Sequence, residues 1–100
     1  MITDNIIEKK LKKKLSEAIE YLKNIGATEI ILFGSMAHGN FNEFSDIDLA
    51  IRGISPKTYF KTIADLSSII HFKVDLVLLD YVSKEFKEKI MSEGELVYAA

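Results

Sequence analysis

The spacing of apolar residues at the start of this chain predicts a long amphipathic helix. Across residues 5–25 the apolar side chains recur every three or four positions, which is the pattern of a helix with one buried face. The stripe consists of Ile7, Leu11, Leu15, Ala18, Leu22 and Ile25. Asn5 and Glu8 have the spacing of a capping box. Gly26 suits the left-handed position that often follows a last helical turn.

Three short segments predict strands. Glu29–Phe33 is rich in β-branched residues and stops at Gly34, as a buried strand would. Residues 46–52 alternate, so that their side chains divide between two faces. One face carries Ile47, Leu49 and Ile51, and the other carries Asp46, Asp48 and Ala50. Residues 72–79 form the third predicted strand.

Two further helices follow from capping signals. Ser55 and Pro56 are a cap and first-turn pair, and they predict a helix through about residue 70. Its apolar stripe is Tyr59 or Phe60, Ile63, Leu66 and Ile70. Ser83 predicts the start of a last helix that ends at Gly94. The order of elements indicates a single domain over residues 1–100 with an α/β or α+β fold.

Composition and charge narrow the function classes. Hydrophobic residues make up 48% of the chain, enough for a core, and the absence of cysteine excludes disulfides, thiol catalysis and cysteine-bound zinc. Apolar runs are short and no leader pattern opens the chain, so we expect a cytoplasmic protein without a membrane span. The net charge of -2 argues against a general nucleic-acid binder.

The charge is unevenly distributed. Residues 1–25 carry six lysines and four acidic residues, whereas residues 26–100 carry seven basic and eleven acidic residues. The basic excess lies in Lys9, Lys10, Lys12, Lys13 and Lys14. A solvated helix face is the ordinary interpretation of such a run, and a patch for a phosphate backbone or an acidic partner is the alternative.

Three aspartates are the candidate catalytic and metal-binding residues. Asp46 and Asp48 are two positions apart in a predicted strand, so their side chains point to the same side, with Cα atoms about 6.5–7 Å apart. Asp75 lies within the third predicted strand. If that strand pairs beside residues 46–52, three carboxylates converge and repel one another, which indicates a cation between them.

Carboxylate oxygens suit Mg²⁺ or Mn²⁺, and three aspartates suit a pair of such ions. In the alternative interpretation Asp46 caps a turn, and Asp48 and Asp75 lie at exposed strand ends.

Gly34 and Ser35 form a turn that could hold a phosphate, because glycine permits a positive φ and the serine can cap a following turn whose N–H groups face outward. Together with the aspartates, this turn indicates phosphoryl or nucleotidyl transfer.

The pattern GSxAxG at residues 34–39, followed by SDIDL at residues 45–49, resembles the signature of the DNA polymerase β nucleotidyltransferase superfamily. In size the chain is similar to its minimal nucleotidyltransferase (MNT) group. The resemblance implies the nucleotidyltransferase fold, with a small mixed β-sheet of three to four strands packed with helices. It extends from Gly34 to Asp75, and the end of the last helix at residues 93–98 is also typical.

The resemblance implies specific roles. Gly34 and Ser35 would hold the β- and γ-phosphates of ATP, while Asp46 and Asp48 would bind two Mg²⁺ ions. Asp75 would bind the metal ion next to the acceptor hydroxyl and help to deprotonate it.

The motif departs from the family at one position. His38 stands where the family often has arginine, so it is either a weaker phosphate contact or an exposed loop residue. His71 has no motif partner and is interpreted as structural, and Asp80 as a turn residue.

Minimal members of the family are commonly antitoxins paired with HEPN-domain toxin ribonucleases, and some transfer AMP to a tyrosine of the toxin. We therefore predict an adenylyltransferase of this type. The alternatives are a non-catalytic module that neutralises its partner by contact, and transfer to a small molecule or an RNA end. The short chain leads us to expect the acceptor site on a partner or a second copy. The apolar residues 96–100 fit a docking segment or a segment packed on its own core.

Overall fold

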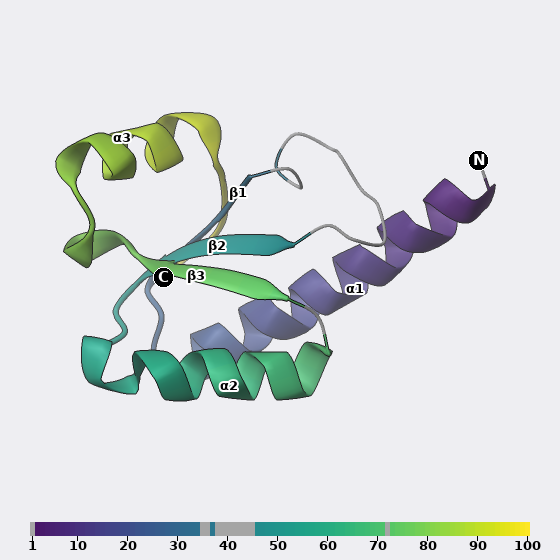
Figure 1. Ribbon diagram of the computed structural model, residues 1–100, viewed down its shortest axis with the longest axis horizontal. Helices are drawn as coiled ribbons and strands as arrows, with labels where there is room; N and C mark the ends of the chain where they lie inside the picture. Colours follow the sequence, from purple (N-terminus) through teal and green to yellow (C-terminus); the bar gives the residue numbers. More distant parts are fainter. Residues whose placement is uncertain (1, 35–36, 38–45, 72) are drawn as a thin grey trace.

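Within residues 2–34, 37, 46–71 and 73–100, which the computed structural model describes, the chain forms a four-stranded sheet with helices on both faces (Figure 1). Side chains are described from Lys9 onward. The elements are α1 (Ile2–Asn24), β1 (Glu29–Phe33), β2 (Ile47–Arg52), η2 (Pro56–Thr58), α2 (Tyr59–Ile70), β3 (Val74–Leu78), η3 (Leu79–Tyr81), α3 (Lys84–Glu93) and β4 (Glu95–Ala99). The predicted fold class is confirmed.

The sheet is mixed and has the strand order β3-β2-β1-β4. β1 lies in the middle and pairs antiparallel with both β2 and β4. β2 and β3 are parallel, and α2 provides the crossover that a parallel pair requires. Because β2 and β3 run parallel to each other and β1 runs antiparallel to β2, the N-terminal ends of β2 and β3 lie at the same edge as the C-terminal end of β1, which brings residues from three segments together.

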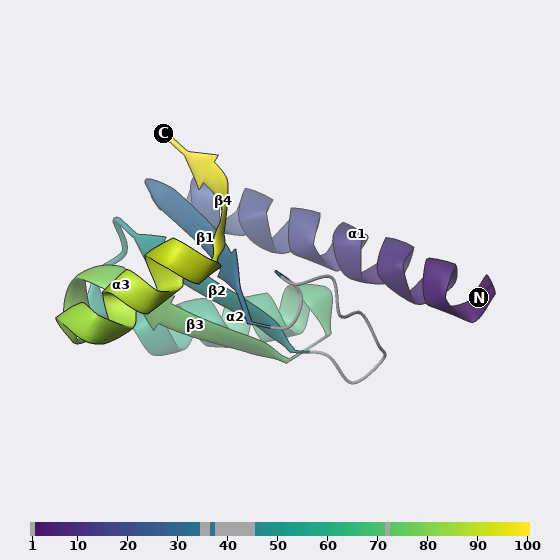
Figure 2. The same ribbon diagram turned by 90° about the horizontal axis from the view of Figure 1, so that it is seen from above.

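The two faces of the sheet carry separate cores. α1 and α2 lie on one face and α3 on the other (Figure 1). The larger core lies between the sheet and α1 and α2, and includes Leu11, Leu22, Ile30, Leu49, Ile51, Leu66 and Ile70. The smaller core consists of Ile31, Ala50, Leu79 and Ile90, beneath α3. Alternate residues of β1 and β2 therefore point to opposite faces. Ile30 and Leu49 enter the larger core, and Ile31 and Ala50 enter the smaller core. In both ribbon views the N-terminal ends of β2 and β3 extend beyond α3 (Figure 2).

Two predictions about the first helices need correction. α1 begins at Ile2, so Asn5 lies inside the helix and the predicted capping box is wrong. Ile25 is 38% exposed because it follows the last turn instead of continuing the apolar stripe. Gly26 has the expected positive φ, 111°. In α2 it is Tyr59 that packs on the core, whereas Phe60 is 82% exposed.

The C-terminal region also differs from the prediction. Gly94 has a φ of -84°, so it is not a left-handed cap. A Cβ atom there would lie 2.6 Å from Cγ2 of Ile31 and 2.7 Å from the carbonyl oxygen of Ile90, so close packing explains the glycine. The apolar tail forms β4 and packs Val97 and Tyr98 on the larger core, which favours the second of the two interpretations of this segment.

The third strand is shorter than the predicted residues 72–79. β3 ends at Leu78, Leu79 begins η3, and Phe72 lies outside the described residues. His71 ends α2 in the left-handed conformation and donates its backbone N–H to the carbonyl of Ser67, which agrees with a structural role. Asp80 lies in η3, as its interpretation as a turn residue predicts. In the described part of the chain, each helix is too short or too polar to span a membrane.

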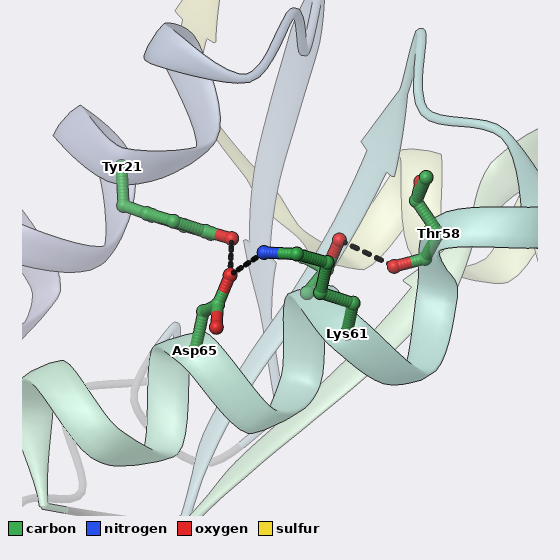
Figure 3. A network of polar contacts seen from close by, with 5 residues as sticks. Tyr21, Thr58, Lys61 and Asp65 are labelled. Atoms are coloured by element: carbon green, nitrogen blue, oxygen red, sulfur yellow. Dashed lines mark hydrogen bonds and ion pairs between the residues drawn. The ribbon is translucent and has the colours of Figure 1, made fainter.

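A polar network joins α1 to α2 (Figure 3). The Tyr21 hydroxyl donates a hydrogen bond of 2.7 Å to Oδ2 of Asp65, and Nζ of Lys61 lies 2.8 Å from the same oxygen. Beside this network, the buried Thr62 hydroxyl donates to the carbonyl of Thr58. Burial and the contact with Asp65 raise the pKa of Tyr21 to about 12, while the hydrogen bonds from Lys61 and Tyr21 lower the pKa of Asp65. The network therefore favours a protonated tyrosine and an ionised carboxylate.

Candidate active site

A row of three residues crosses the sheet at the edge that extends beyond α3. Phe33 is the register partner of Asp48 in the antiparallel β1–β2 pair, and Asp48 is the partner of Asp75 in the parallel β2–β3 pair. Because register partners project to the same face, an aromatic ring and two carboxylates lie side by side. Asp48 is half-buried and Asp75 is exposed. The third strand does pair beside residues 46–52, which was the condition for bringing the carboxylates together.

Asp48 and Asp75 form a like-charge pair. Burial, followed by the side-chain hydrogen bond to Asp75 and the charges of Asp75 and Asp46, raises the pKa of Asp48 to about 6, and the charge of Lys73 opposes this shift. A raised pKa means that the folded protein favours the protonated form of Asp48 over the ionised form. The pair therefore has an unfavourable electrostatic environment that a nearby positive charge would relieve.

Asp46 lies just before β2, and its side chain is placed differently. Its Oδ2 is 3.4 Å from Nζ of Lys73, so it forms an ion pair while adding negative charge near Asp48. Among the described residues, no three acidic, histidine or cysteine side chains are already arranged to enclose a metal ion. The structure thus brings Asp48 and Asp75 together and pairs Asp46 with a lysine. The donor set still fits a divalent cation, because carboxylate oxygens are its preferred ligands and their mutual repulsion would be offset.

Gly34 lies directly against this carboxylate pair. Its φ is 75°, and a Cβ atom there would collide with Oδ2 of Asp48 and lie 2.9 Å from Cγ. Glycine is therefore required both by the backbone conformation and by the close approach of Asp48. The carbonyl of Gly34 accepts a hydrogen bond from the backbone N–H of Ala37. Ser35 and His38, the other predicted phosphate contacts, lie outside the described residues.

A pocket of about 230 Å³ adjoins Gly34, between the end of β1 and α3. It is lined by Phe33, Gly34, Phe86, Lys89, Ile90 and Glu93. Phe33 and Phe86 were not predicted as site residues. One signal for Phe33 was present, because the last residue of a strand before the glycine turn must lie beside that turn. Nothing in the local sequence indicated that Phe86 meets it.

Comparison with known proteins identifies the family of this chain. Residues 9–100 match the family described as polymerase beta, nucleotidyltransferase. A curated relative from Methanocaldococcus jannaschii, named "Putative protein adenylyltransferase", is 30% identical over 101 residues, which span 91% of this chain and 98% of that protein. The family match covers the whole sheet and all the predicted site residues.

Solved structures share the fold. The crystal structure of a toxin–antitoxin with AMP-PNP superposes with a TM-score of 0.66 and 26% identity, over 93% of this chain and 73% of that chain. A tri-AMPylated HEPN toxin in complex with its MNT antitoxin, from Shewanella oneidensis, gives a TM-score of 0.57 and 23% identity, over 97% of this chain and 73% of that chain. The second likeness supports the fold alone.

Proposed function

Since this chain belongs to the polymerase β nucleotidyltransferase family, we propose that it transfers AMP from ATP to a tyrosine of a HEPN-domain toxin. It would thereby act as the antitoxin of a toxin–antitoxin pair. The name of the M. jannaschii relative and the AMP-PNP bound by a similar toxin–antitoxin support adenylyl transfer. The proposed class of partner is taken from the similar structure of a HEPN toxin in complex with its MNT antitoxin.

The observation that carries the proposal is the pair of Asp48 and Asp75, which are register partners on adjacent strands beside Gly34. Two adjacent carboxylates destabilise a sheet unless a cation or a shared proton compensates them. Nothing in the packing of β2 and β3 requires this pair, since Ala50 and Val77 continue the same face with apolar side chains. Such uncompensated charge is typical of functional sites.

The residues of the site can be assigned roles in the transfer. Asp46, Asp48 and Asp75 would hold divalent metal ions, whose charge, when bound, offsets that of the triphosphate. Gly34 and Ser35 would receive the β- and γ-phosphates. The tyrosine oxygen forms a bond to the α-phosphorus, and the bond from this phosphorus to the bridging oxygen breaks, so that pyrophosphate leaves with the electron pair. Asp75, which is exposed, would accept the hydroxyl proton.

The test is an AMP-transfer assay with the full chain, a purified HEPN-domain protein, MgCl₂ and ATP labelled at either the α- or the γ-phosphate. We expect the α-label, and not the γ-label, to appear on the HEPN protein, with a matching gain in its intact mass. The variant D46N/D48N should not transfer the label. Asp65→Asn is the matched control, because it removes a carboxylate outside the site, and it should keep the activity.

Absence of labelling with the wild-type chain, or equal labelling with D46N/D48N, would refute the proposed function. A ribonuclease assay of the toxin separates the two modes of neutralisation. If D46N/D48N neutralises the toxin as fully as the wild type, neutralisation occurs by contact, and the non-catalytic alternative is correct.

A further inference from the structure

The pocket beside Gly34 has an apolar interior and a charged rim. Ile90 is buried, and the rings of Phe33 and Phe86 meet edge to face, with centroids 6.4 Å apart and an interplanar angle of 89°. Phe86 is nevertheless 40% exposed, so part of its ring remains available to a ligand. Lys89 and Glu93 are exposed and lie one helical turn apart on α3. This combination suits a flat, apolar group that has polar edges.

The position of the pocket indicates which substrate reaches it. Gly34 forms part of its wall and also contacts the Asp48 side of the carboxylate pair. Asp75, where the acceptor hydroxyl is expected, lies on β3, two strands from β1 and therefore about 9–10 Å away. A group covalently attached to phosphates at Gly34 is thus better placed to enter the pocket than a tyrosine approaching Asp75.

The size of the pocket is consistent with a single ring system. A volume of about 230 Å³ is smaller than the roughly 300–1,000 Å³ typical of sites that enclose a whole drug-sized ligand. It would hold the base of a nucleotide and leave the sugar and phosphates outside. A carboxylate at the rim, Glu93, can accept a hydrogen bond from an amino group of the base, and Lys89 can donate to a phosphate or a ring nitrogen.

We propose that the pocket between β1 and α3 is the nucleobase site, in which the exposed part of Phe86 packs against the ring of the base. This inference rests on the proposed function, since it names the part of the nucleotide that the same site recognises. Aromatic packing would strengthen nucleotide binding by about tenfold or more relative to the phosphates alone. Phe86 is then an affinity determinant that takes no part in the phosphoryl chemistry.

Isothermal titration calorimetry of the full chain tests the proposal with two ligands, ATP and inorganic tripolyphosphate, each with MgCl₂. Wild-type protein should bind ATP about tenfold or more tightly than tripolyphosphate. Phe86→Ala should weaken ATP binding to the level of tripolyphosphate, whose own affinity should stay within about twofold. Phe60→Ala is the matched control, because it removes the ring of an exposed phenylalanine on α2, and it should change neither affinity.

Circular dichroism establishes whether each variant is folded. If Phe86→Ala is unfolded, Phe86→Leu takes its place, since it keeps apolar volume while removing the ring and should still reduce the preference for ATP. Equal wild-type affinities for the two ligands, or a preference for ATP that survives the loss of the Phe86 ring, would overturn the base site and leave the proposed transferase intact. Unchanged nucleotide binding with slower transfer to the toxin would assign the pocket to the acceptor and also overturn it. Wild-type protein that binds neither ligand would refute both proposals.

Discussion

The α1–α2 contact and the shared edge of β1, β2 and β3 each contain a partly exposed carboxylate, and their surroundings are opposite. Asp65 accepts hydrogen bonds from Tyr21 and Lys61, which lower its pKa (Figure 3). Asp48 is half-buried beside a second carboxylate, and its pKa is raised to about 6. The first region supplies hydrogen-bond donors that stabilise an ionised carboxylate, whereas in the second region two carboxylates repel each other. The comparison shows that one aspartate is stabilised as the ionised form by its neighbours and the other is not, and the second kind of environment is the one typical of functional sites.

Replacement of Asp48 should have the largest effect and should separate activity from stability. Asp48→Asn should lower AMP transfer by about 100- to 1,000-fold or more, in the range measured for loss of a key electrostatic group. In metal-free protein at pH 7 the same change should raise the free energy of unfolding by about 1 kcal/mol, a value discounted for partial exposure, because a like-charge repulsion is removed. Transfer assays and urea unfolding in EDTA measure the two quantities. A destabilised Asp48→Asn would contradict this account.

The pH dependence of stability gives a related check. The folded protein holds the Asp48 proton more tightly than the unfolded chain, with a pKa of about 6 against 3.8. This contribution to stability is therefore fully present below about pH 4 and is lost as the pH rises through about 6. In urea unfolding of metal-free protein between pH 4 and 7, the stability of the wild type should fall relative to that of Asp48→Asn. A constant difference between them would be the contrary result.

Two glycine variants test the close approach at the site. Gly34 and Gly26 both have a positive φ, 75° and 111°, so alanine should strain either backbone by about 1 kcal/mol or somewhat more. A Cβ atom at Gly34 would also collide with Asp48, whereas a Cβ atom at Gly26 meets nothing within 4 Å. Gly34→Ala should therefore lower AMP transfer by about tenfold or more, and Gly26→Ala should keep it. Equal activities in the two variants would show that the close approach of Gly34 to Asp48 is not needed for AMP transfer.

The smallest effect is expected at the α1–α2 contact. Tyr21→Phe should lower the free energy of unfolding at pH 7 by about 0.5–1 kcal/mol, because one hydrogen bond is lost, and it should leave AMP transfer unchanged. The Tyr21 pKa is raised from 10.0 to about 12, so its contribution is complete below pH 10 and disappears as the pH rises through about 12. Urea unfolding of wild type and variant at pH 7 and pH 11 measures this change. A difference that grows at pH 11 would contradict it.

Local signals were enough to predict most elements of the fold. The β-branched run before Gly34 predicted β1 with its observed bounds, and Ser55 and Ser83 cap η2 and α3 through their side-chain oxygens. These features depend on residues a few positions apart, and so they can be identified without knowing the fold. The resemblance allowed for a fourth strand but did not locate it, and the end of the last helix was wrongly expected at residues 93–98, where β4 begins at Glu95. A short apolar tail becomes a strand only where an unpaired strand edge, here that of β1, is available to it.

The helices, three of the strands, and the carboxylates and glycine of the candidate site could be predicted from the amino-acid sequence. The folded structure was needed to show that Phe33, Asp48 and Asp75 share a row, that Asp46 pairs with Lys73, and that Phe86 meets Phe33 from a separate helix. Helix periodicity and capping depend on residues that are only a few positions apart, so they can be identified in the sequence. Strand register and helix docking depend on which distant apolar faces can be buried together, and that is settled only when the whole core forms.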